Sequence, residues 1–411
     1  MRSRSNKWVI GVILVLTLAL LTPLAGAAPA AYKVGFITSI TGFMSPMGTG
    51  ARDAAQLVVE RINAQGGVNG HPLELVLYDD GSDPSKGVMA LKKLIGEDEV
   101  LMVIGPLSTG IAMACAPIAE RAEVPLFAQN SSSWSVALKP WNIPEPPENI
   151  RKWVFKPGID PIFQDVAVFR MLEKRGAHRL AHMNVNNAMG KAMKASFAAS
   201  CEDAGLEVVI WEEYGREDTD LTIPLTKIKA TDFDAMVIAG AEMAGAIAYK
   251  QAREMGITQP VIGMPPLAMG RIMAVLGSSL DGLLIPSYVV NLGADLSVDD
   301  PQRTPVMELT ELVVENTDSE RADTGHTAGW DGVSLAVDAL ERAEPDLSDL
   351  QKARSQVREA LETTKGYVGV QSIGDMTRWH EIPAPMIPCE VRDSKLRAVA
   401  EKITPTWADM E

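Results

Sequence analysis

The feature that most constrains this sequence is a regular alternation of short apolar runs and amphipathic stretches in its first third. Three of the runs have the length and composition of buried strands, and the two stretches between them have helical periodicity. The strands are expected at residues 32–37, 73–78 and 101–104, and the helices at residues 51–63 and 84–94. This order predicts a parallel sheet with right-handed crossovers. Ligands of such sheets bind where the strands end.

The first of these helices shows the periodicity most clearly. Its apolar residues recur at the spacing of one helical face, and its charged residues fall on the other face. The apolar face consists of Ala51, Ala54, Ala55, Val58, Val59 and Ile62. We therefore expect this helix to lie flat on the sheet.

The alternation restarts beyond residue 153. Strands are expected at residues 153–157, 179–185, 206–211, 235–239, 261–263 and 283–288, with helices at 163–174, 189–204, 223–230, 244–255 and 267–276. Three more helices are expected at residues 306–315, 327–343 and 350–363, before a tail with strand-like pieces. A chain of 411 residues is too long for one compact core, so two α/β lobes are predicted.

The N-terminus has the pattern of a secretory signal. Basic residues precede an apolar run at residues 8–21, and small residues follow it. A transmembrane anchor is the alternative, but the run is short and ends in a cleavable pattern. Residues 1–30 are therefore assigned to a signal peptide that is cleaved after Ala27 or Ala30, which predicts a periplasmic location.

Charge and cysteine content exclude several classes. A net charge of −15 argues against nucleic acid as a partner, because phosphates repel an acidic surface. Cys115, Cys201 and Cys389 are too far apart to form a disulfide framework, although a bridge between Cys201 and Cys389 is an alternative.

Several motifs, in a fixed order, resemble a known family. They are Gly35-Phe36-Ile37 with Thr41-Gly42, Asn63-Ala64-Gln65-Gly66-Gly67-Val68-Asn69-Gly70, Tyr78-Asp79-Asp80 with Asp83-Pro84, Ile104-Gly105-Pro106 with Ser108-Thr109, Leu225-Thr226-Lys227-Ile228-Lys229, Gln251-Ala252-Arg253-Glu254-Met255-Gly256 and Trp330-Asp331-Gly332. In these motifs, over about residues 32–391, the chain resembles the periplasmic solute-binding proteins of the leucine/isoleucine/valine-binding type, which serve ABC transporters.

The resemblance implies the type I periplasmic binding protein fold, with two three-layer lobes of parallel sheet joined by three crossover segments. One lobe would hold residues 31–155 and 286–366, and the other residues 156–285 and 367–411. The crossings are expected near residues 155–157, 285–287 and 367–369. A ligand would bind between the lobes and close them about this hinge.

In this family, hydroxyl and amide groups of the first lobe hold the ligand carboxylate. Ser108 and Thr109 stand where a strand ends and a helix begins, a position that binds anions or simply caps the helix. The following strand end carries Asn130, Ser131 and Ser132, of which Ser132 matches the family hydroxyl and Asn130 the backbone donor. A solvated turn is the alternative for this loop.

The chain departs from the amino-acid binders of the family at three positions. Met47 stands where they carry an aromatic residue, and Met189 where they carry a tyrosine. The stretch around Pro265 has no acid to hold an ammonium group. Because an unpaired buried ammonium is costly, these departures favour a carboxylate with an apolar or aromatic body. If Glu242 replaces the missing acid, an amino-acid ligand is favoured instead.

The remaining features concern packing and chemistry. Trp330 is a further candidate ligand contact, and Asp331 beside it is expected to begin a helix. Catalytic, phosphate-binding and metal-binding motifs are absent from the sequence, so we expect neither an enzyme nor a cofactor. The sequence thus predicts a monomeric binding protein that delivers its ligand to an ABC permease. A ligand sensor of the same fold is the alternative.

Overall fold

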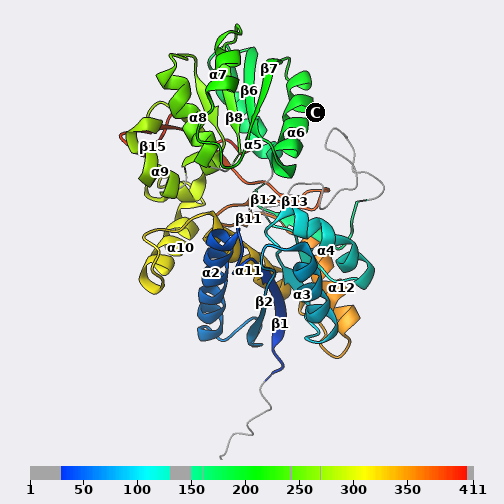
Figure 1. Cartoon of the computed structure of the whole chain (residues 1–411). Helices are drawn as coiled ribbons and strands as arrows, with labels where there is room; N and C mark the ends of the chain where they lie inside the picture. The colour runs from blue at the N-terminus through cyan, green and yellow to red at the C-terminus, as the bar shows by residue number, and fades with distance from the viewer. Residues whose placement is uncertain (1–28, 130–149, 160, 241–242, 269, 405–411) are drawn as a thin grey trace, which may run out of the picture.

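The computed structural model describes residues 29–129, 150–159, 161–240, 243–268 and 270–404. Its two large sheets lie in two halves, one above the other in Figure 1. We call the half that contains β1 the first half and the half that contains β6 the second half. Helices pack on both faces of each sheet, which confirms the expected three-layer α/β architecture.

The first sheet has the strand order β13-β5-β4-β3-β1-β2, and all its neighbouring strands run parallel. Its strands are β1 (Tyr32–Thr38), β2 (Leu73–Asp79), β3 (Met102–Ile104), β4 (Leu126–Phe127), β5 (Val154–Pro157) and β13 (Glu381–Ile382). The helices of this half are α2 (Ser45–Ala64), α3 (Pro84–Gly96), α4 (Thr109–Ala122), α10 (Arg303–Asn316), α11 (Thr324–Ala343) and α12 (Leu350–Glu362).

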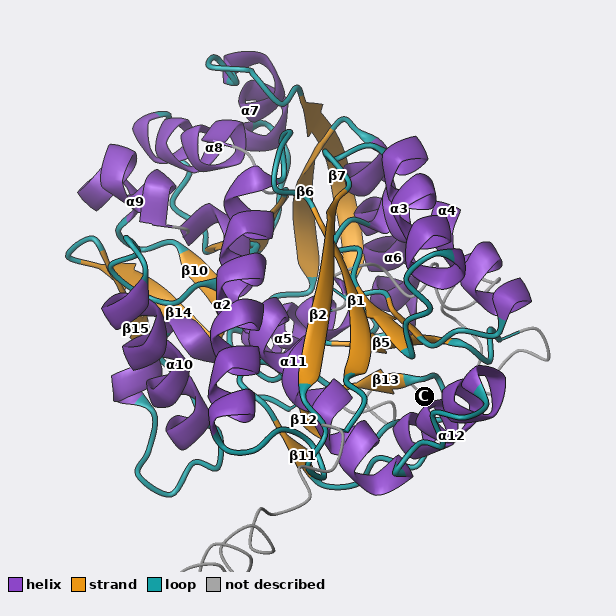
Figure 2. Ribbon diagram, turned by 90° about the horizontal axis from the view of Figure 1, so that it is seen from below, coloured by secondary structure: helices purple, strands orange, loops and turns teal. Residues whose placement is uncertain are grey.

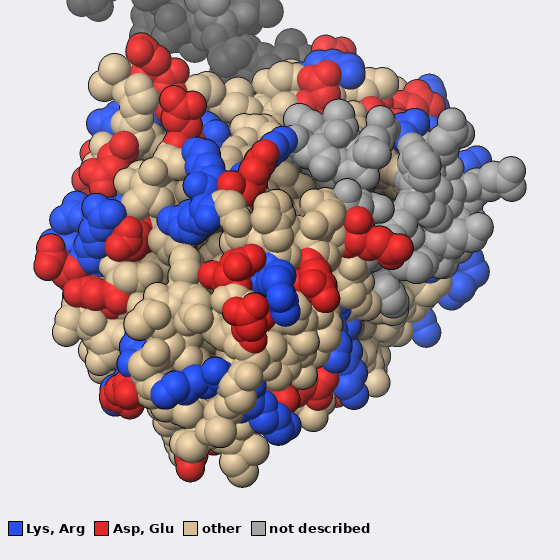
Figure 3. Space-filling view, turned by 90° about the horizontal axis from the view of Figure 1, so that it is seen from above, with Lys and Arg blue, Asp and Glu red and all other residues tan. Residues whose placement is uncertain are grey.

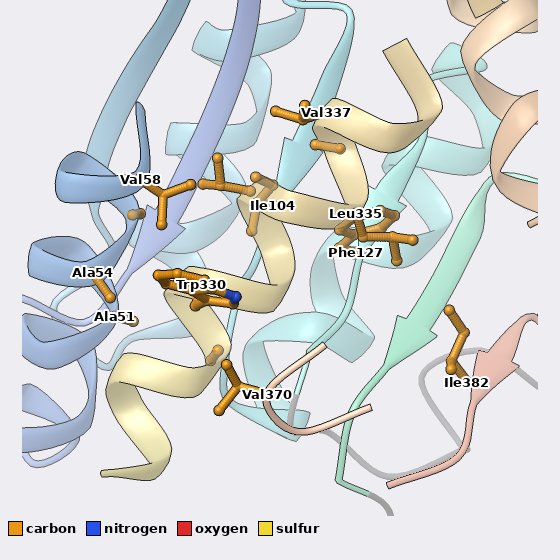
Figure 4. Close-up of a cluster of buried hydrophobic side chains, with 14 of the residues drawn as sticks. Ala51, Ala54, Val58, Ile104, Phe127, Trp330, Leu335, Val337, Val370 and Ile382 are labelled. Atoms are coloured by element: carbon orange, nitrogen blue, oxygen red, sulfur yellow. The ribbon is translucent and has the colours of Figure 1, made fainter. Parts of the chain in front are cut away.

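Alternating side chains of β1 pack on the two helical layers of this half. Val34 and Phe36 belong to the cluster formed with α2 and α11, which Figure 4 shows in part. Ile37 points to the other face and packs with residues of α3 and α4. Helices therefore flank the strands on both sides when the molecule is seen from below (Figure 2). Burial on both faces explains why the strand reads as a continuous apolar run.

The second sheet has the order β15-β14-β10-β9-β8-β6-β7. Its strands are β6 (Arg179–Val185), β7 (Glu207–Tyr214), β8 (Ala235–Ala239), β9 (Val261–Gly263), β10 (Leu284–Tyr288), β14 (Met386–Arg392) and β15 (Lys395–Ala398). Within the described sheet, β14 runs antiparallel to both of its neighbours, β10 and β15. The helices are α5 (Pro161–Glu173), α6 (Ala188–Asp203), α7 (Thr222–Lys229), α8 (Met243–Glu254) and α9 (Gly270–Leu276), with the short 3₁₀ helix η3 (Pro265–Ala268) before α9.

The chain passes between the sheets at one edge of each, which we call the crossover edge. It consists of β5 and β13 in the first sheet and β10 and β14 in the second. The first two passages follow β5 and β10. The third lies between β13, which pairs with β5, and β14. The opposite edge, which we call the far edge, consists of β2 and β7.

Helix α2 begins earlier than its apolar periodicity indicates. It starts at Ser45 rather than at residue 51, with Pro46 in its first turn, where proline is tolerated. A Cβ atom at Gly48 would lie 2.0 Å from the backbone oxygen of Ser39, so this first turn approaches the end of β1 more closely than any other residue allows. Gly48, which suggests a loop in the sequence, instead allows the helix to pack closely against the end of the strand.

All three cysteines are free and buried, so the alternative bridge between Cys201 and Cys389 is not formed. Burial raises the pKa of each thiol to about 12, which is typical of unreactive core cysteines. Within the described residues, none of the helices combines the length and apolar character needed to cross a membrane. The predicted signal peptide comprises residues 1–30. Of these, residues 1–28 lie outside the described part of the chain.

Candidate ligand-binding site

The predicted carboxylate site lies at the start of α4, after β3. Ser108 is the N-cap residue, with extended backbone at φ −101° and ψ 131°, and its side chain makes no capping hydrogen bond. Ser108 and Thr109 are partly exposed, and a Cβ added at Gly110 would meet no atom within 4 Å. Among the residues that the structure describes, the first turn of α4 thus has open space beside Gly110. Its backbone N–H groups have the orientation that favours an anion.

The loop after β1 is held beside this helix start by two adjacent carboxylates at the end of β2. Asp79 accepts hydrogen bonds from the backbone N–H groups of Ile40 and Thr41, at 2.8 and 3.2 Å, and from the Thr41 hydroxyl at 2.6 Å. Asp80 accepts one from the Ser39 hydroxyl at 2.5 Å. The sequence analysis gave these carboxylates no chemical role. In the structure they fix the conformation of a loop at the carboxyl end of the sheet.

The two carboxylates differ in their electrostatic environment. Burial opposes ionisation of Asp79, but its hydrogen bonds to Thr41, Gly81 and Ile40 together hold its pKa below the ordinary value. Asp80 is fully buried, and burial raises its pKa although Ser39 and Ser82 donate to it. The stabilising hydrogen bonds therefore dominate at Asp79, and desolvation dominates at Asp80.

Two candidate contact residues of the first half lie in different environments. Met47 is partly buried in the first turn of α2, where Gly325 of α11 packs against its backbone. Trp330 is 4% exposed and packs among Ala51, Ala54 and neighbouring side chains in the core (Figure 4). The guanidinium carbon of Arg61 lies 4.6 Å from the Trp330 ring centroid. These contacts give Trp330 a packing role, and its contact with a ligand stays a prediction.

The candidate residues of the second half follow its strand ends. Met189 lies in the first turn of α6, which Asn187 caps by accepting a hydrogen bond from the Gly190 N–H at 2.8 Å. Pro265 is buried at the start of η3, directly after β9. Glu242, Asn130, Ser131 and Ser132 lie outside the described residues, as does the side chain of Met189.

The loops at the carboxyl ends of the two sheets meet near the far edge. Phe43 lies in the loop after β1, and Arg216 follows β7. The guanidinium carbon of Arg216 is 5.3 Å from the centroid of the Phe43 ring. The ends of the two sheets that should carry the ligand groups therefore face each other.

Asp331 holds a loop of the C-terminal tail against α11, a role that the sequence did not indicate. It lies within α11 rather than at its start, so the expectation that it begins a helix is wrong. Its carboxylate accepts hydrogen bonds from the backbone N–H groups of Val370, Gln371 and Ser372 at 2.7, 2.9 and 2.9 Å. Burial raises its pKa to about 6 against the effect of these donors. It thus anchors the loop between β11 (Tyr367–Val368) and β12 (Ile373–Gly374) to the first half.

A second set of contacts at the crossover edge involves charged groups. Lys156 of β5 and Glu381 of β13 approach within 3.9 Å, with side chains 0% and 1% exposed. Lys402, in the segment after β15, lies 2.6 Å from Asp300 and donates to Gln302 at 3.2 Å. Gln302 precedes α10, so this contact ties the edge of the second sheet to the first half.

Comparison with known proteins assigns the chain to a family. The sequence model of the periplasmic binding proteins matches residues 31–395. The chain belongs to this family. Members of the family bind solutes and are not enzymes, and the fold is the type I periplasmic binding protein fold. Among the described residues, no group of three His, Cys, Asp or Glu side chains could hold a metal ion.

Curated relatives are named as amino-acid-binding proteins. The chain is 25% identical to the Leu/Ile/Val-binding protein BraC3 of Rhizobium johnstonii, over 63% of this chain and 69% of that protein. It is 24% identical to the leucine-, isoleucine-, valine-, threonine- and alanine-binding protein of Pseudomonas aeruginosa, over 61% of this chain and 65% of that one. The aligned part therefore spans about two thirds of these relatives.

Solved structures share the fold across nearly the whole chain. The binding protein LivJ of Streptococcus pneumoniae, solved with isoleucine, has a TM-score of 0.72 and 22% identity, and the match covers 91% of this chain and 100% of LivJ. An extracellular ligand-binding receptor from Rhodopseudomonas palustris has a TM-score of 0.76 and 19% identity, covering 90% and 100%. At this level of identity the likeness concerns the fold.

Proposed function

We propose that this periplasmic binding protein is the solute-binding component of an ABC transporter. It captures a small carboxylate with an apolar or aromatic body between its two halves, which close about the crossover edge. Ser108 and Thr109, with Asn130, Ser131 and Ser132 of the next loop, hold the carboxylate. Met47, Met189 and Pro265 contact the body of the ligand. The protein acts as a monomer in the periplasm and presents the closed, loaded form to permease subunits.

The start of α4 is the observation that carries this proposal. The Ser108 side chain does not cap its own helix, and space beside Gly110 leaves the first turn accessible. Helix N-termini stabilise anions through partly unpaired N–H groups and the helix dipole. The loop after β1, held by Asp79 and Asp80, provides a fixed wall at the same end of the sheet. A preorganised site of this kind loses little entropy on binding.

A branched-chain amino acid is the second candidate ligand, because the relatives are named for leucine, isoleucine and valine. The two candidates differ in one group, the ammonium. Residues 263–266 contain no acid, and Pro265 there is buried. Glu242 is the residue that would have to pair with the ammonium for this candidate to hold.

A matched pair of ligands tests this difference. Leucine and 4-methyl-2-oxopentanoate share the carboxylate and the branched body but differ at the α-position. Titration calorimetry with both, and with aromatic acids, gives the affinities. We expect the oxo acid or an aromatic acid to bind at least about tenfold more tightly than leucine, roughly 1.4 kcal/mol. Tighter binding of leucine would reject the carboxylate-only ligand and favour the amino-acid one.

Single hydroxyl deletions test the site itself. Thr109→Ala and Ser132→Ala should each weaken ligand binding by about 1–3 kcal/mol, because each removes a hydrogen bond to a charged group. Thr109→Ser, which retains the hydroxyl, is the matched control and should bind nearly as well as the parent. Unchanged affinity in both alanine variants, with unchanged melting temperature, would place the carboxylate elsewhere.

A further inference from the structure

The contact between Phe43 and Arg216 lies near the far edge, away from the crossover edge. Phe43 follows β1, which is next to the edge strand β2, and Arg216 follows β7, the edge strand of the second sheet. The chain passes between the halves at the opposite edges, through β5, β13, β10 and β14. A rotation about the crossover edge would therefore change the separation of Phe43 and Arg216 more than that of residues near the passages.

Phe43 is presented by a loop that has little freedom. Asp79 binds the backbone of Ile40 and Thr41 on one side of it, and the Met44 N–H donates to the Ser82 hydroxyl at 3.1 Å on the other. Phe43 itself is 60% exposed, which is unusual for a large apolar side chain. The loop thus holds an aromatic ring out from the first half toward the second.

Arg216 is placed by a tight turn after β7. The Gly215 N–H donates to the Asp218 carboxylate at 2.6 Å, and the Asp218 N–H donates back to the Gly215 carbonyl at 3.2 Å. The preceding residue, Tyr214, is buried and its hydroxyl donates to the Ala239 carbonyl at 3.0 Å. Both partners of the contact therefore sit on loops that are fixed to their own sheets.

We propose that Phe43 and Arg216 are positioning residues that stabilise the closed arrangement of the two halves, whether or not ligand is bound. They touch no ligand and act by raising the population of the closed state. The effect of this contact on affinity rests on the ligand-binding function proposed above. A contact biases a two-state equilibrium only if it differs between the states, and the far edge is where that difference is largest. Apparent affinity scales with the population of the binding-competent state.

The expected size follows from the chemistry of the contact. A cation over an aromatic face at an exposed site changes an equilibrium by about two- to fivefold. Loss of either partner should therefore raise the ratio of open to closed molecules by about that factor. Ligand dissociation should accelerate by a similar factor, since the closed state is the one that retains ligand.

Distance measurements on the ligand-free protein test this directly. Spin labels on Lys92→Cys in α3 and Ile223→Cys in α7 report the separation of the halves, and both positions are exposed. Phe43→Leu keeps an apolar side chain without the aromatic face, and Arg216→Gln removes the cation. We expect both variants to enrich the wider distances about two- to fivefold. The double variant should show no further change, since either substitution alone breaks the contact.

Lys93→Gln is the matched control. Lys93 lies over the Tyr78 ring at the same 5.3 Å, but both residues belong to the first half. This variant should leave the distance distribution unchanged, and Arg216→Lys should restore part of the parental distribution because it keeps a cation. Unchanged distances in both Phe43→Leu and Arg216→Gln, in protein with parental melting temperature, would overturn the proposal.

The ligand titrations complete the test. If Arg216→Gln weakens binding while Phe43→Leu does not, Arg216 contacts the ligand instead and the positioning role is rejected. Failure of every carboxylate and amino acid to bind, with distances that still widen in both variants, would reject the proposed function and leave the positioning role intact. The two proposals therefore fail separately.

Discussion

The two edges of this molecule are built differently. Beside the crossover edge, buried charges and backbone hydrogen bonds hold strands and loops of the first half together, as at Lys156, Glu381 and Asp331. At the far edge, an exposed guanidinium lies over an exposed aromatic ring. Buried polar contacts are costly to break, whereas exposed cation–π contacts are weak. We therefore expect the proposed closure to turn about the crossover edge, while the weak contacts of the far edge form and break.

This difference predicts a division between stability and motion. Substitutions at the crossover edge should change the free energy of unfolding and leave the open-to-closed ratio nearly unchanged. Substitutions at Phe43 or Arg216 should do the reverse. The acidic and basic side chains seen from above in Figure 3 are interspersed, so on that face no patch of one charge is available to bias the motion.

The largest effect is expected at Lys156. Lys156→Met removes the ammonium group that lies 3.9 Å from the Glu381 carboxylate, in a pair whose side chains are 0% and 1% exposed. Breaking one partner of such a pair costs about 3–5 kcal/mol. Urea unfolding of the parent and the variant measures this loss.

The matched control removes both charges together. Lys156→Met combined with Glu381→Met should recover most of the stability, because both charges of the buried pair are then removed. A single variant that loses less than about 1 kcal/mol would mean that water reaches the pair and that the crossover edge is not the rigid part of the molecule.

Lowering the pH should reduce the stability by an intermediate amount, and this loss tests whether the crossover edge couples the halves. His182 of β6 is fully buried among Phe197 and Trp211, and neither ring nitrogen has a hydrogen-bond partner within the described part of the chain. Burial, with a smaller contribution from Lys194, lowers its pKa from 6.5 to about 3. Between these two pKa values, the histidine therefore binds a proton in the unfolded chain but not in the folded one. The free energy of unfolding falls as the pH falls through this range. At about pH 4.5 the loss should be about 2–3 kcal/mol.

His182→Leu should remove most of this acid sensitivity, while His178→Gln, at an exposed histidine just before the same strand, should retain it. Hydrogen exchange near pH 4.5 then shows how far the loss spreads. If the crossover edge couples the halves, peptides of both halves should lose protection together. Loss confined to the second half would contradict that coupling.

The alternation of apolar runs is enough to predict most of the strands and helices before residue 364, because burial on both faces leaves a local record in the sequence. It does not place the strands of the tail, from β11 to β15. The start of α2 was not predictable in this way. Its position depends on the approach of Gly48 to Ser39, a contact that no local pattern shows. The two-residue strand β13 is also invisible locally, since its place is set by pairing with β5.

The candidate site shows the same difference between features that the local sequence predicts and features that depend on the fold. Ser108 could be placed at the start of a helix from its neighbours alone, and the structure finds it there. The roles of Asp79 and Asp331 could not be predicted, because each binds backbone that lies about 40 residues away in the chain. Such contacts depend on the folded arrangement rather than on spacing. The same holds for Phe43 and Arg216, which lie on different halves.

The smallest effect, and the one that most sharpens the contrast with Arg216, is expected at Lys402. Its ion pair with Asp300 joins the halves near the crossover edge, and the two side chains are 20% and 11% exposed. Lys402→Gln should cost about 1 kcal/mol of stability, since the pair is only partly shielded from water. Lys395→Gln, at an exposed lysine of β15, is the control and should cost less than about 0.5 kcal/mol.

Both Lys402 and Arg216 link one half to the other, so they differ chiefly in distance from the passages. In the proposed closure about the crossover edge, the separation of Lys402 from Asp300 should change little, so the loss of Lys402 should leave the label distances as they are in the parent. Arg216→Gln should instead widen those distances at nearly unchanged stability. If Lys402→Gln widens the distances as much as Arg216→Gln does, distance from the passages does not decide which contacts control closure. The contrast between the two edges would then be wrong.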